Sequence, residues 1–210
     1  MTQNTETRKA LLVVDVQNDF CPGGTLAVKN GDKVVEPLNR LIELADKNNW
    51  RLYFSKDWHP EDTKHFKDFG GLWPTHCVKN TLGAKFHPDL KIPERAFMIT
   101  KGTGNNDDGY SPFEGRCEIY QYWPLSLVTL LHGTDELYIG GLATDYCVKA
   151  AVLDALKLDS LKRVYLLTNA VRAVNLRPGD DVDAINQMIN ADVDNKLRFI
   201  TTDEVVRGLG

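Results

Sequence analysis

Short apolar runs alternate with segments of helical period along most of this chain, and that alternation limits the folds open to it. Runs suited to buried strands lie at 10–14, 51–55, 96–101, 136–140, 163–168 and 198–201. Helical periods lie at 34–48, 124–132, 145–158 and 180–192. Strands that alternate with helices predict a mostly parallel sheet with helices on both faces. We therefore expect an α/β fold of three layers, α/β/α, around a sheet of roughly six strands, formed by a single domain over residues 1–210.

The composition indicates a globular protein that acts on a small molecule. The chain has 210 residues, of which 42% are hydrophobic, and a net charge of −4, which suits one well-buried core. Because it has no long run of Lys and Arg, we expect neither nucleic acid nor a membrane surface as its partner. No stretch has the ~20 apolar residues of a membrane span, and residues 1–9 lack the apolar core of a secretory signal.

The cysteines fit a reducing compartment. There are four of them, scattered too widely to form a disulfide framework: Cys21, Cys77, Cys117 and Cys147. Together with the absence of an apolar leader, this spacing predicts a soluble protein of the cytoplasm.

Residues 136–148 contain the first candidate for chemistry. They read as a buried strand, a tight turn at Gly140 and Gly141, and a helix whose first turn carries Cys147. Unpaired N–H groups and the positive end of the dipole at a helix start favour a thiolate, so the pKa of Cys147 is expected below the ~8.5 of a free cysteine. Such a thiol would be a nucleophile. The alternative is that Cys147 is a small apolar residue packing the helix on the sheet.

Two charged residues end other apolar runs. Asp15 follows the run at 10–14, and Lys101 closes the run at 96–101. Because the carboxyl ends of parallel strands form one edge where ligands bind, Asp15 and Lys101 are expected to converge with Cys147. A carboxylate, an ammonium and a thiol supply the base, charge stabiliser and nucleophile of acyl transfer through a covalent intermediate. The alternative is a structural Asp15–Lys101 ion pair, although burying such a pair is seldom a route to stability.

Residues 56–95 break the alternation with many polar, Gly and Pro residues. Long irregular loops in compact domains are uncommon and usually functional. This loop carries one candidate carboxylate ligand and three candidate imidazole ligands: Asp57, His59, His65 and His76. Such a set can hold a divalent metal ion and leave room for water or substrate, so 56–95 is predicted as a metal-binding insert. The alternatives are solvated loop residues, or a closed zinc site that includes His76 and Cys77.

Several short motifs, taken together, resemble those of the isochorismatase-like hydrolases. They are Asp-x-Gln-x-Asp-Phe at 15–20, Lys-Asp-Trp-His-Pro at 56–60, Trp-Pro-x-His-Cys at 73–77, Lys-Gly at 101–102 and Gly-Leu-Ala-Thr-Asp-Tyr-Cys-Val at 141–148. The resemblance runs from about residue 10 to residue 200. Within the family, the metal motif is similar to that of the branch that hydrolyses nicotinamide and its analogue pyrazinamide.

The resemblance implies a role for each matched residue. The implied catalytic residues are Asp15, Lys101 and Cys147, and the implied metal ligands are Asp57, His59, His65 and His76. The implied ion is zinc in the first place, with iron or manganese as alternatives. The implied walls around a pyridine ring are Phe20, Trp73 and Tyr110, although these three could also be core residues. The implied oxyanion hole is formed by the backbone N–H groups of Ala143 and Cys147, with a cis peptide between Leu142 and Ala143.

The implied reaction converts nicotinamide to nicotinate and ammonia through a thioester on Cys147, a step of NAD salvage. Three alternatives remain: a related hydrolase acting on another amide or an enol ether, a hydrolase in which an ion-bound hydroxide attacks and Cys147 only packs, and a heterocycle-binding protein without chemistry. A homo-oligomer could form through the apolar positions of 124–132 together with Tyr120, Tyr122 and Trp123, which could equally be core.

Overall fold

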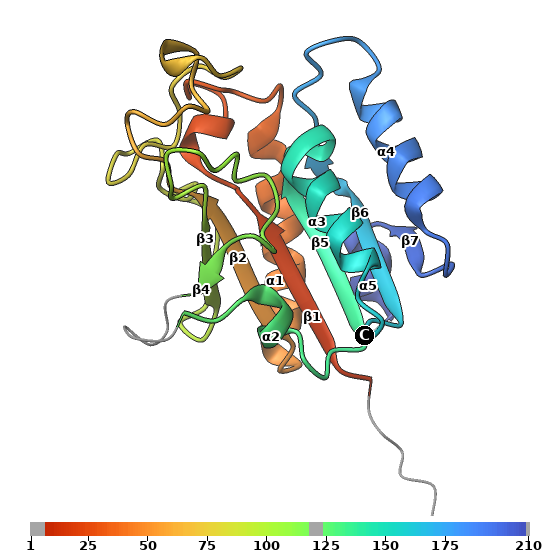
Figure 1. Cartoon of the computed structure of the whole chain (residues 1–210). Helices are drawn as coiled ribbons and strands as arrows, with labels where there is room; N and C mark the ends of the chain where they lie inside the picture. Colours follow the sequence, from red (N-terminus) through yellow and green to blue (C-terminus); the bar gives the residue numbers. More distant parts are fainter. Residues whose placement is uncertain (1–6, 118–123, 209–210) are drawn as a thin grey trace, which may run out of the picture.

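A computed structural model describes residues 7–117 and 124–208 of the chain (Figure 1). The described residues form a sheet of seven strands in the order β4-β3-β2-β1-β5-β6-β7. The strands are β1 (Lys9–Val14), β2 (Arg51–Asp57), β3 (Phe97–Lys101), β4 (Arg116–Cys117), β5 (Glu136–Leu142), β6 (Arg163–Arg172) and β7 (Leu197–Ile200). The α-helices are α1 (Val35–Lys47), α2 (Leu127–Leu130), α3 (Lys149–Leu156), α4 (Asp180–Ala191) and α5 (Thr202–Gly208). Neighbouring strands are parallel except β3 and β4.

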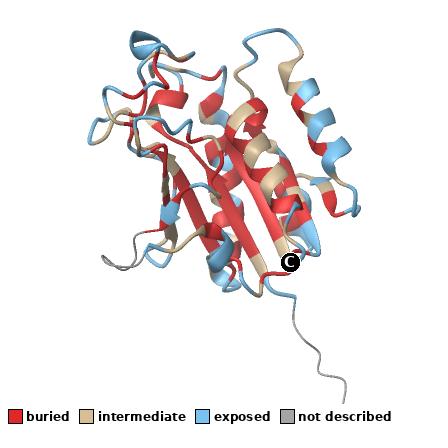
Figure 2. Cartoon of the chain, in the orientation of Figure 1, coloured by how far each residue is buried: buried red, intermediate tan, exposed pale blue. Residues whose placement is uncertain are grey.

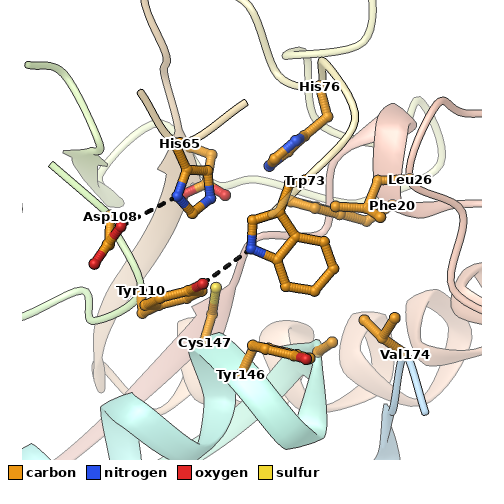
Figure 3. Close-up of a pocket in the computed structure, with 12 residues that line it drawn as sticks. Phe20, Leu26, His65, Trp73, His76, Asp108, Tyr110, Tyr146, Cys147 and Val174 are labelled. Carbon is orange, nitrogen blue, oxygen red and sulfur yellow. Dashed lines mark hydrogen bonds and ion pairs between the residues drawn. The ribbon is translucent and has the colours of Figure 1, made fainter. Parts of the chain in front are cut away.

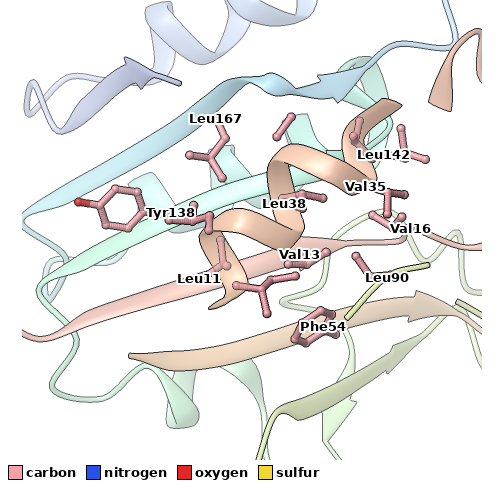
Figure 4. Close-up of a cluster of buried hydrophobic side chains, with 14 of the residues drawn as sticks. Leu11, Val13, Val16, Val35, Leu38, Phe54, Leu90, Tyr138, Leu142 and Leu167 are labelled. Atoms are coloured by element: carbon pink, nitrogen blue, oxygen red, sulfur yellow. The ribbon is translucent and has the colours of Figure 1, made fainter. Parts of the chain in front are cut away.

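The helices cover both faces of the sheet, as the sequence predicted (Figure 1). Side chains alternate across a strand, so β1 supplies both cores. Its residues Leu11 and Val13 belong to the same buried cluster as Leu38 of α1 (Figure 4). Leu12 of β1 lies in the cluster on the other face with Ala151 of α3. The central strands are therefore buried on both faces, as Figure 2 shows.

One strand and one α-helix were not predicted, and the α-helix expected at 124–132 is much shorter than predicted. The missed elements are β4, an antiparallel edge strand of two residues, and the short C-terminal α5. The helix expected at 124–132 is reduced to α2, because the backbone of Leu125 is bonded to that of Cys117. The Cys117 N–H donates to the Leu125 carbonyl at 2.9 Å, and the Leu125 N–H donates to the Cys117 carbonyl at 3.0 Å. The helix therefore begins only after Ser126, whose side chain accepts a hydrogen bond from the Thr129 N–H. Tyr120, Tyr122 and Trp123, considered as a subunit contact, lie outside the described residues.

The turn predicted at Gly140 and Gly141 is wrong, since both glycines lie inside β5. Gly141 has a φ of 124°, and a Cβ at this position would lie 2.7 Å from the backbone nitrogen of Val14 in β1. Glycine is required here by close approach of two strands as well as by its backbone conformation. The chain turns only after Leu142 and forms a π-helical turn, Thr144–Val148, that leads into α3.

The order of the strands identifies the edge at which a site is expected. From β1 the chain builds outward through β2 and β3, and then returns to the other side of β1 with β5, so the order reverses between β1 and β5. Ligands of open α/β sheets bind at this switch point, outside the carboxyl ends of the strands. The long irregular loop between β2 and β3 lies at that edge (Figure 1). Across residues 7–117 and 124–208, no helix has the length and apolar character needed to cross a membrane.

Candidate active site

The structure brings the three predicted catalytic side chains together at the switch point. Asp15 follows β1, Lys101 ends β3, and Cys147 lies in the π-helical turn after β5. All three are buried. The Lys101 Nζ lies 2.7 Å from the Asp15 Oδ2 and 3.5 Å from the Cys147 Sγ. The Asp15–Lys101 ion pair therefore exists, and the thiol lies against it.

Burial decides the protonation state of the thiol. It raises the pKa of Cys147 well above its usual range, and the nearby Lys101 only partly opposes this shift. The prediction of a lowered thiol pKa is therefore wrong: loss of water around the sulfur outweighs the helix start. Burial likewise raises the pKa of Asp15 to about 6, against the pull of Lys101. At neutral pH the site thus contains a thiol beside a carboxylate that can accept its proton.

The ammonium of Lys101 balances two carboxylates. Burial alone would lower its pKa, but Asp15 and Asp57 hold the pKa well above the usual range, so the side chain stays charged. Lys101 Nζ forms a second ion pair with Asp57 Oδ1 and donates to the carbonyl of Gly109 at 2.5 Å. Burial would raise the pKa of Asp57, but Lys101 and His59 together hold it below its usual value.

The three histidines of the loop converge in a second group. Ring nitrogens of His59, His65 and His76 lie within 4.8 Å of one another. In each ring Nδ1 faces an oxygen: the Gly102 carbonyl at 3.0 Å, the Asp108 carboxylate at 3.4 Å and the Pro74 carbonyl at 2.8 Å, respectively. With Nδ1 engaged, Nε2 is the nitrogen left to bind an ion.

Two observations indicate that these rings suit a divalent metal. The Nε2 of His59 is buried and has no hydrogen-bond partner among the described residues, and it lies 3.7 Å from the Asp57 Oδ2. Burial also lowers the pKa of His76 to about 4 and lowers that of His65, so both are neutral at pH 7, as metal ligands must be. Cys77 is not in this group in the described chain; its N–H donates to Asp19 Oδ2 at 2.7 Å.

A pocket that is partly open to solvent lies between the two groups and is lined by Cys147 of the first and by His65 and His76 of the second (Figure 3). Its lining residues are Phe20, Leu26, Asp57, His65, Trp73, His76, Asp108, Tyr110, Ala143, Tyr146, Cys147 and Val174. The three predicted aromatic walls are among them, and the Trp73 indole N–H donates to the Tyr110 hydroxyl at 2.9 Å. Apolar and aromatic walls with a few polar groups are typical of a site for a small flat molecule.

Several lining residues were not predicted. The Tyr146 ring packs edge-on against the Trp73 ring, with 4.7 Å between the ring centroids. Its position next to Cys147 in the sequence could have indicated that it lines the site. Leu26, Asp108 and Val174 come from irregular segments without any local pattern that marks them.

The turn after β5 also contains the predicted oxyanion donors. The N–H groups of Tyr146 and Val148 both donate to the Ala143 carbonyl at 3.1 Å. In the part of the chain that the structure describes, the N–H of Cys147, which lies between them, does not share this acceptor. The peptide between Leu142 and Ala143 is cis, as the resemblance implied.

A doubly wound sheet of the α/β class with a thiol, a carboxylate and an ammonium at its switch point is typical of hydrolases that have a cysteine in their site. Comparisons with known proteins agree. The sequence pattern of the Isochorismatase domain matches residues 9–194. The chain belongs to the isochorismatase family.

The relatives narrow this assignment further. A nicotinamidase of Escherichia coli (strain K12) is 40% identical over 199 residues, which cover 86% of this chain and 90% of that protein. The crystal structure of the pyrazinamidase of Pyrococcus horikoshii in complex with zinc has a TM-score of 0.79 at 37% identity, covering 92% of this chain and 99% of that one. PnC1 from L. infantum in complex with nicotinate has a TM-score of 0.73 at 30% identity, covering 92% of this chain and 96% of that one. The prediction of an amidohydrolase is confirmed by these relatives.

Proposed function

We propose that this protein hydrolyses nicotinamide to nicotinate and ammonia, in the NAD salvage of the cytoplasm, and accepts pyrazinamide as an analogue. The observation that carries the proposal is that one small aromatic pocket is lined both by Cys147, which lies against the Asp15–Lys101 ion pair, and by His65 and His76 of the histidine group. The names of the relatives support the substrate. The free, buried cysteines suit a reducing compartment.

The residues that would hold the metal ion are Asp57, His59, His65 and His76. A divalent ion held there, zinc in the first place because the Pyrococcus horikoshii relative contains it, would supply a Lewis-acid position for the pyridine nitrogen, which would orient the carboxamide toward Cys147. Phe20, Trp73 and Tyr110 enclose the flat ring on its apolar faces.

The first half of the reaction transfers the acyl group to Cys147. The thiol gives its proton to Asp15, its sulfur forms a bond to the carboxamide carbon, and the carbonyl π electrons move to oxygen. The N–H groups of Ala143 and Cys147 stabilise this oxyanion. When the C=O bond re-forms, the C–N bond breaks, and the nitrogen takes the proton from Asp15 to leave as ammonia.

The second half releases nicotinate from the thioester. Asp15, again a carboxylate, accepts a proton from water as its oxygen attacks the acyl carbon. The C–S bond then breaks, and the Cys147 sulfur recovers the proton from Asp15. The product leaves as nicotinic acid and gives its remaining proton to solvent to become nicotinate. Lys101 stays charged throughout and stabilises the anionic groups around it.

Rapid quenching followed by intact-protein mass spectrometry tests this scheme. Metal-loaded protein mixed with nicotinamide should carry a nicotinoyl adduct that maps to Cys147 and disappears as nicotinate accumulates. Cys147→Ala is the control and should carry none. Turnover without an adduct, persisting in Cys147→Ala, would instead show direct attack by a metal-activated water.

A further inference from the structure

The hydroxyl of Ser55 contacts the carboxylate of Asp15 but has no role in the reaction proposed above. Ser55 lies in β2, beside β1, and is completely buried. Its Oγ donates to the Asp15 Oδ1 at 2.6 Å, and its carbonyl accepts from the Asp15 N–H at 3.1 Å. Ser55 therefore binds both the side chain and the backbone of the proposed base.

Asp15 needs such support, because its own strand has ended. The paired residues of β1 and β2 stop at Val14 and Ser55, and Asp15 follows with a φ of 48°. This left-handed conformation is uncommon for residues other than glycine and persists only where surrounding contacts hold it. The two bonds from Ser55 are contacts of this kind.

The two carboxylate oxygens of Asp15 have different surroundings. Oδ1 accepts the Ser55 hydroxyl. Oδ2 lies 2.7 Å from the Lys101 ammonium, which is itself 3.5 Å from the Cys147 sulfur. Within the described residues, Oδ2 is buried and makes no hydrogen bond of good geometry, so it has lone-pair capacity for an incoming proton.

We infer that Ser55 is a positioning residue of the reaction: its hydroxyl occupies Oδ1 and holds the carboxylate so that Oδ2 exchanges protons with Cys147, the leaving ammonia and the attacking water. This inference rests on the proposed function. The proton leaves Sγ for Oδ2 as the S–C bond forms, and leaves Oδ2 for nitrogen as the C–N bond breaks. In the second half it moves from water to Oδ2 and then back to Sγ, so Oδ1 never takes part.

We expect the Ser55 hydroxyl to affect kcat but not substrate or metal binding. Ser55 contacts Asp15 and, like Asp15 itself, is not among the residues that line the pocket. Loss of its hydroxyl should leave KM for nicotinamide and the metal content near their wild-type values. It should lower kcat by roughly 10- to 100-fold, the effect expected when a general base loses its alignment. A purely structural role would lower stability and leave kcat unchanged.

Four variants test this in the metal-loaded protein. Ser55→Ala removes the hydroxyl, Ser55→Cys keeps its shape but donates poorly, and Ser55→Thr keeps a hydroxyl and should restore most of kcat. Thr202→Val is the matched control, because it removes another fully buried hydroxyl. This hydroxyl belongs to the first residue of α5 and accepts a hydrogen bond from the Asn169 side chain at 3.0 Å. Thr202 does not line the pocket. Kinetics, bound metal and thermal unfolding would be measured for each.

A second readout does not depend on nicotinamide. The rate at which iodoacetamide alkylates Cys147, followed by peptide mass spectrometry, reports proton removal from the thiol. We expect it to fall in Ser55→Ala and Ser55→Cys and to be retained in Ser55→Thr and Thr202→Val. Wild-type kcat and alkylation in folded Ser55→Ala would overturn the inference, as would a fall in kcat that Thr202→Val shares. If the wild-type protein released no ammonia, the proposed function would fail, and the alkylation rates alone would decide the role of Ser55.

Discussion

Lys101 is the residue on which the charge balance of the site depends. Its buried ammonium lies between the carboxylates of Asp15 and Asp57 and beside the sulfur of Cys147. The same positive charge thus contacts the proposed catalytic residues Asp15 and Cys147 and the proposed metal ligand Asp57. Because buried charges are costly without partners, the ammonium of Lys101 favours the ionised form of both carboxylates.

The protonation of Asp15 predicts how activity depends on pH. Burial raises the pKa of this carboxyl to about 6, so it is protonated below that pH and cannot accept the thiol proton. We expect kcat/KM for nicotinamide to rise with a single-proton dependence as pH increases through about 6. The stability contribution of Asp15 has the opposite sign: a raised pKa favours the folded state at low pH, and this contribution is lost as pH rises through about 6. A kcat/KM that stays constant down to about pH 5 would exclude Asp15 as the base with this pKa.

At the scale of elements, the side chain of Gln17 links the end of β1 to the loop after β2. Its Nε2 donates to the carbonyls of Asp57 and Ala84, both at 2.9 Å, and its Oε1 accepts from the Asp57 N–H at 2.8 Å. This buried amide thereby fixes the backbone of a proposed metal ligand. The motif at 15–20 contained Gln17, but nothing in the spacing of the sequence indicated its partners.

Replacing Gln17 should weaken both the fold and the metal site. Gln17→Ala leaves buried backbone groups of the loop without partners, so we expect a loss of roughly 1–3 kcal/mol in the free energy of unfolding. We also expect metal affinity to fall about 10-fold, as when outer partners of ligands are removed. Denaturant unfolding and metal titration measure the two effects. The control is Asn39→Ala, which breaks bonds to Asp89 and Lys91 farther along the loop, at 2.7 and 2.8 Å, and should leave metal affinity unchanged.

The close approach of β1 and β5 at Gly141 can be tested by adding a single methyl group there. Gly141→Ala would force a Cβ against the backbone of Val14 and should lower the free energy of unfolding by about 3 kcal/mol or more. Gly179→Ala is the matched control, because Gly179 also has a positive φ, 96°, but no atom lies within 4 Å of the added Cβ. We expect that variant to lose only about 1 kcal/mol. Equal losses in the two variants would mean that backbone conformation, and not the contact with β1, explains the glycine.

The elements also show what the sequence could predict. Apolar runs located six strands because central parallel strands are buried on both faces and need continuous apolar stretches. The same pattern did not predict β4, which is too short to form an apolar run. It also predicted a turn at Gly140 and Gly141, although glycine is required there because other strands approach closely. For the site, residue type and strand ends predicted which side chains meet. The partners of Ser55, the lining role of Val174 and the raised pKa of Cys147 depend on burial and three-dimensional contacts, which spacing alone does not contain.

At the scale of the whole molecule, the site joins two halves of the sheet and the loop that covers its edge. Asp15 and Cys147 follow adjacent strands at the reversal of strand order, while the histidines come from the loop after β2. An ion held by that loop would bind the folded chain and not the unfolded one, and would therefore stabilise the fold by mass action.

Metal removal should consequently change stability as well as activity. Treatment with a chelator is expected to lower the melting temperature and abolish ammonia release, and added zinc should restore both. His59→Ala, which removes a proposed ligand, should melt at the same temperature with and without chelator. Identical melting curves for metal-loaded and chelator-treated wild-type protein would contradict a metal site in this loop.

The most direct test of the account is ammonia release from nicotinamide by the metal-loaded protein, measured beside Cys147→Ala with equal metal content. We expect rapid release by the wild-type protein and none above background in the variant, because the variant lacks the only atom proposed to attack the amide. Release by Cys147→Ala near the wild-type rate would contradict the cysteine mechanism. No release by folded, metal-loaded wild-type protein would contradict nicotinamide as the substrate.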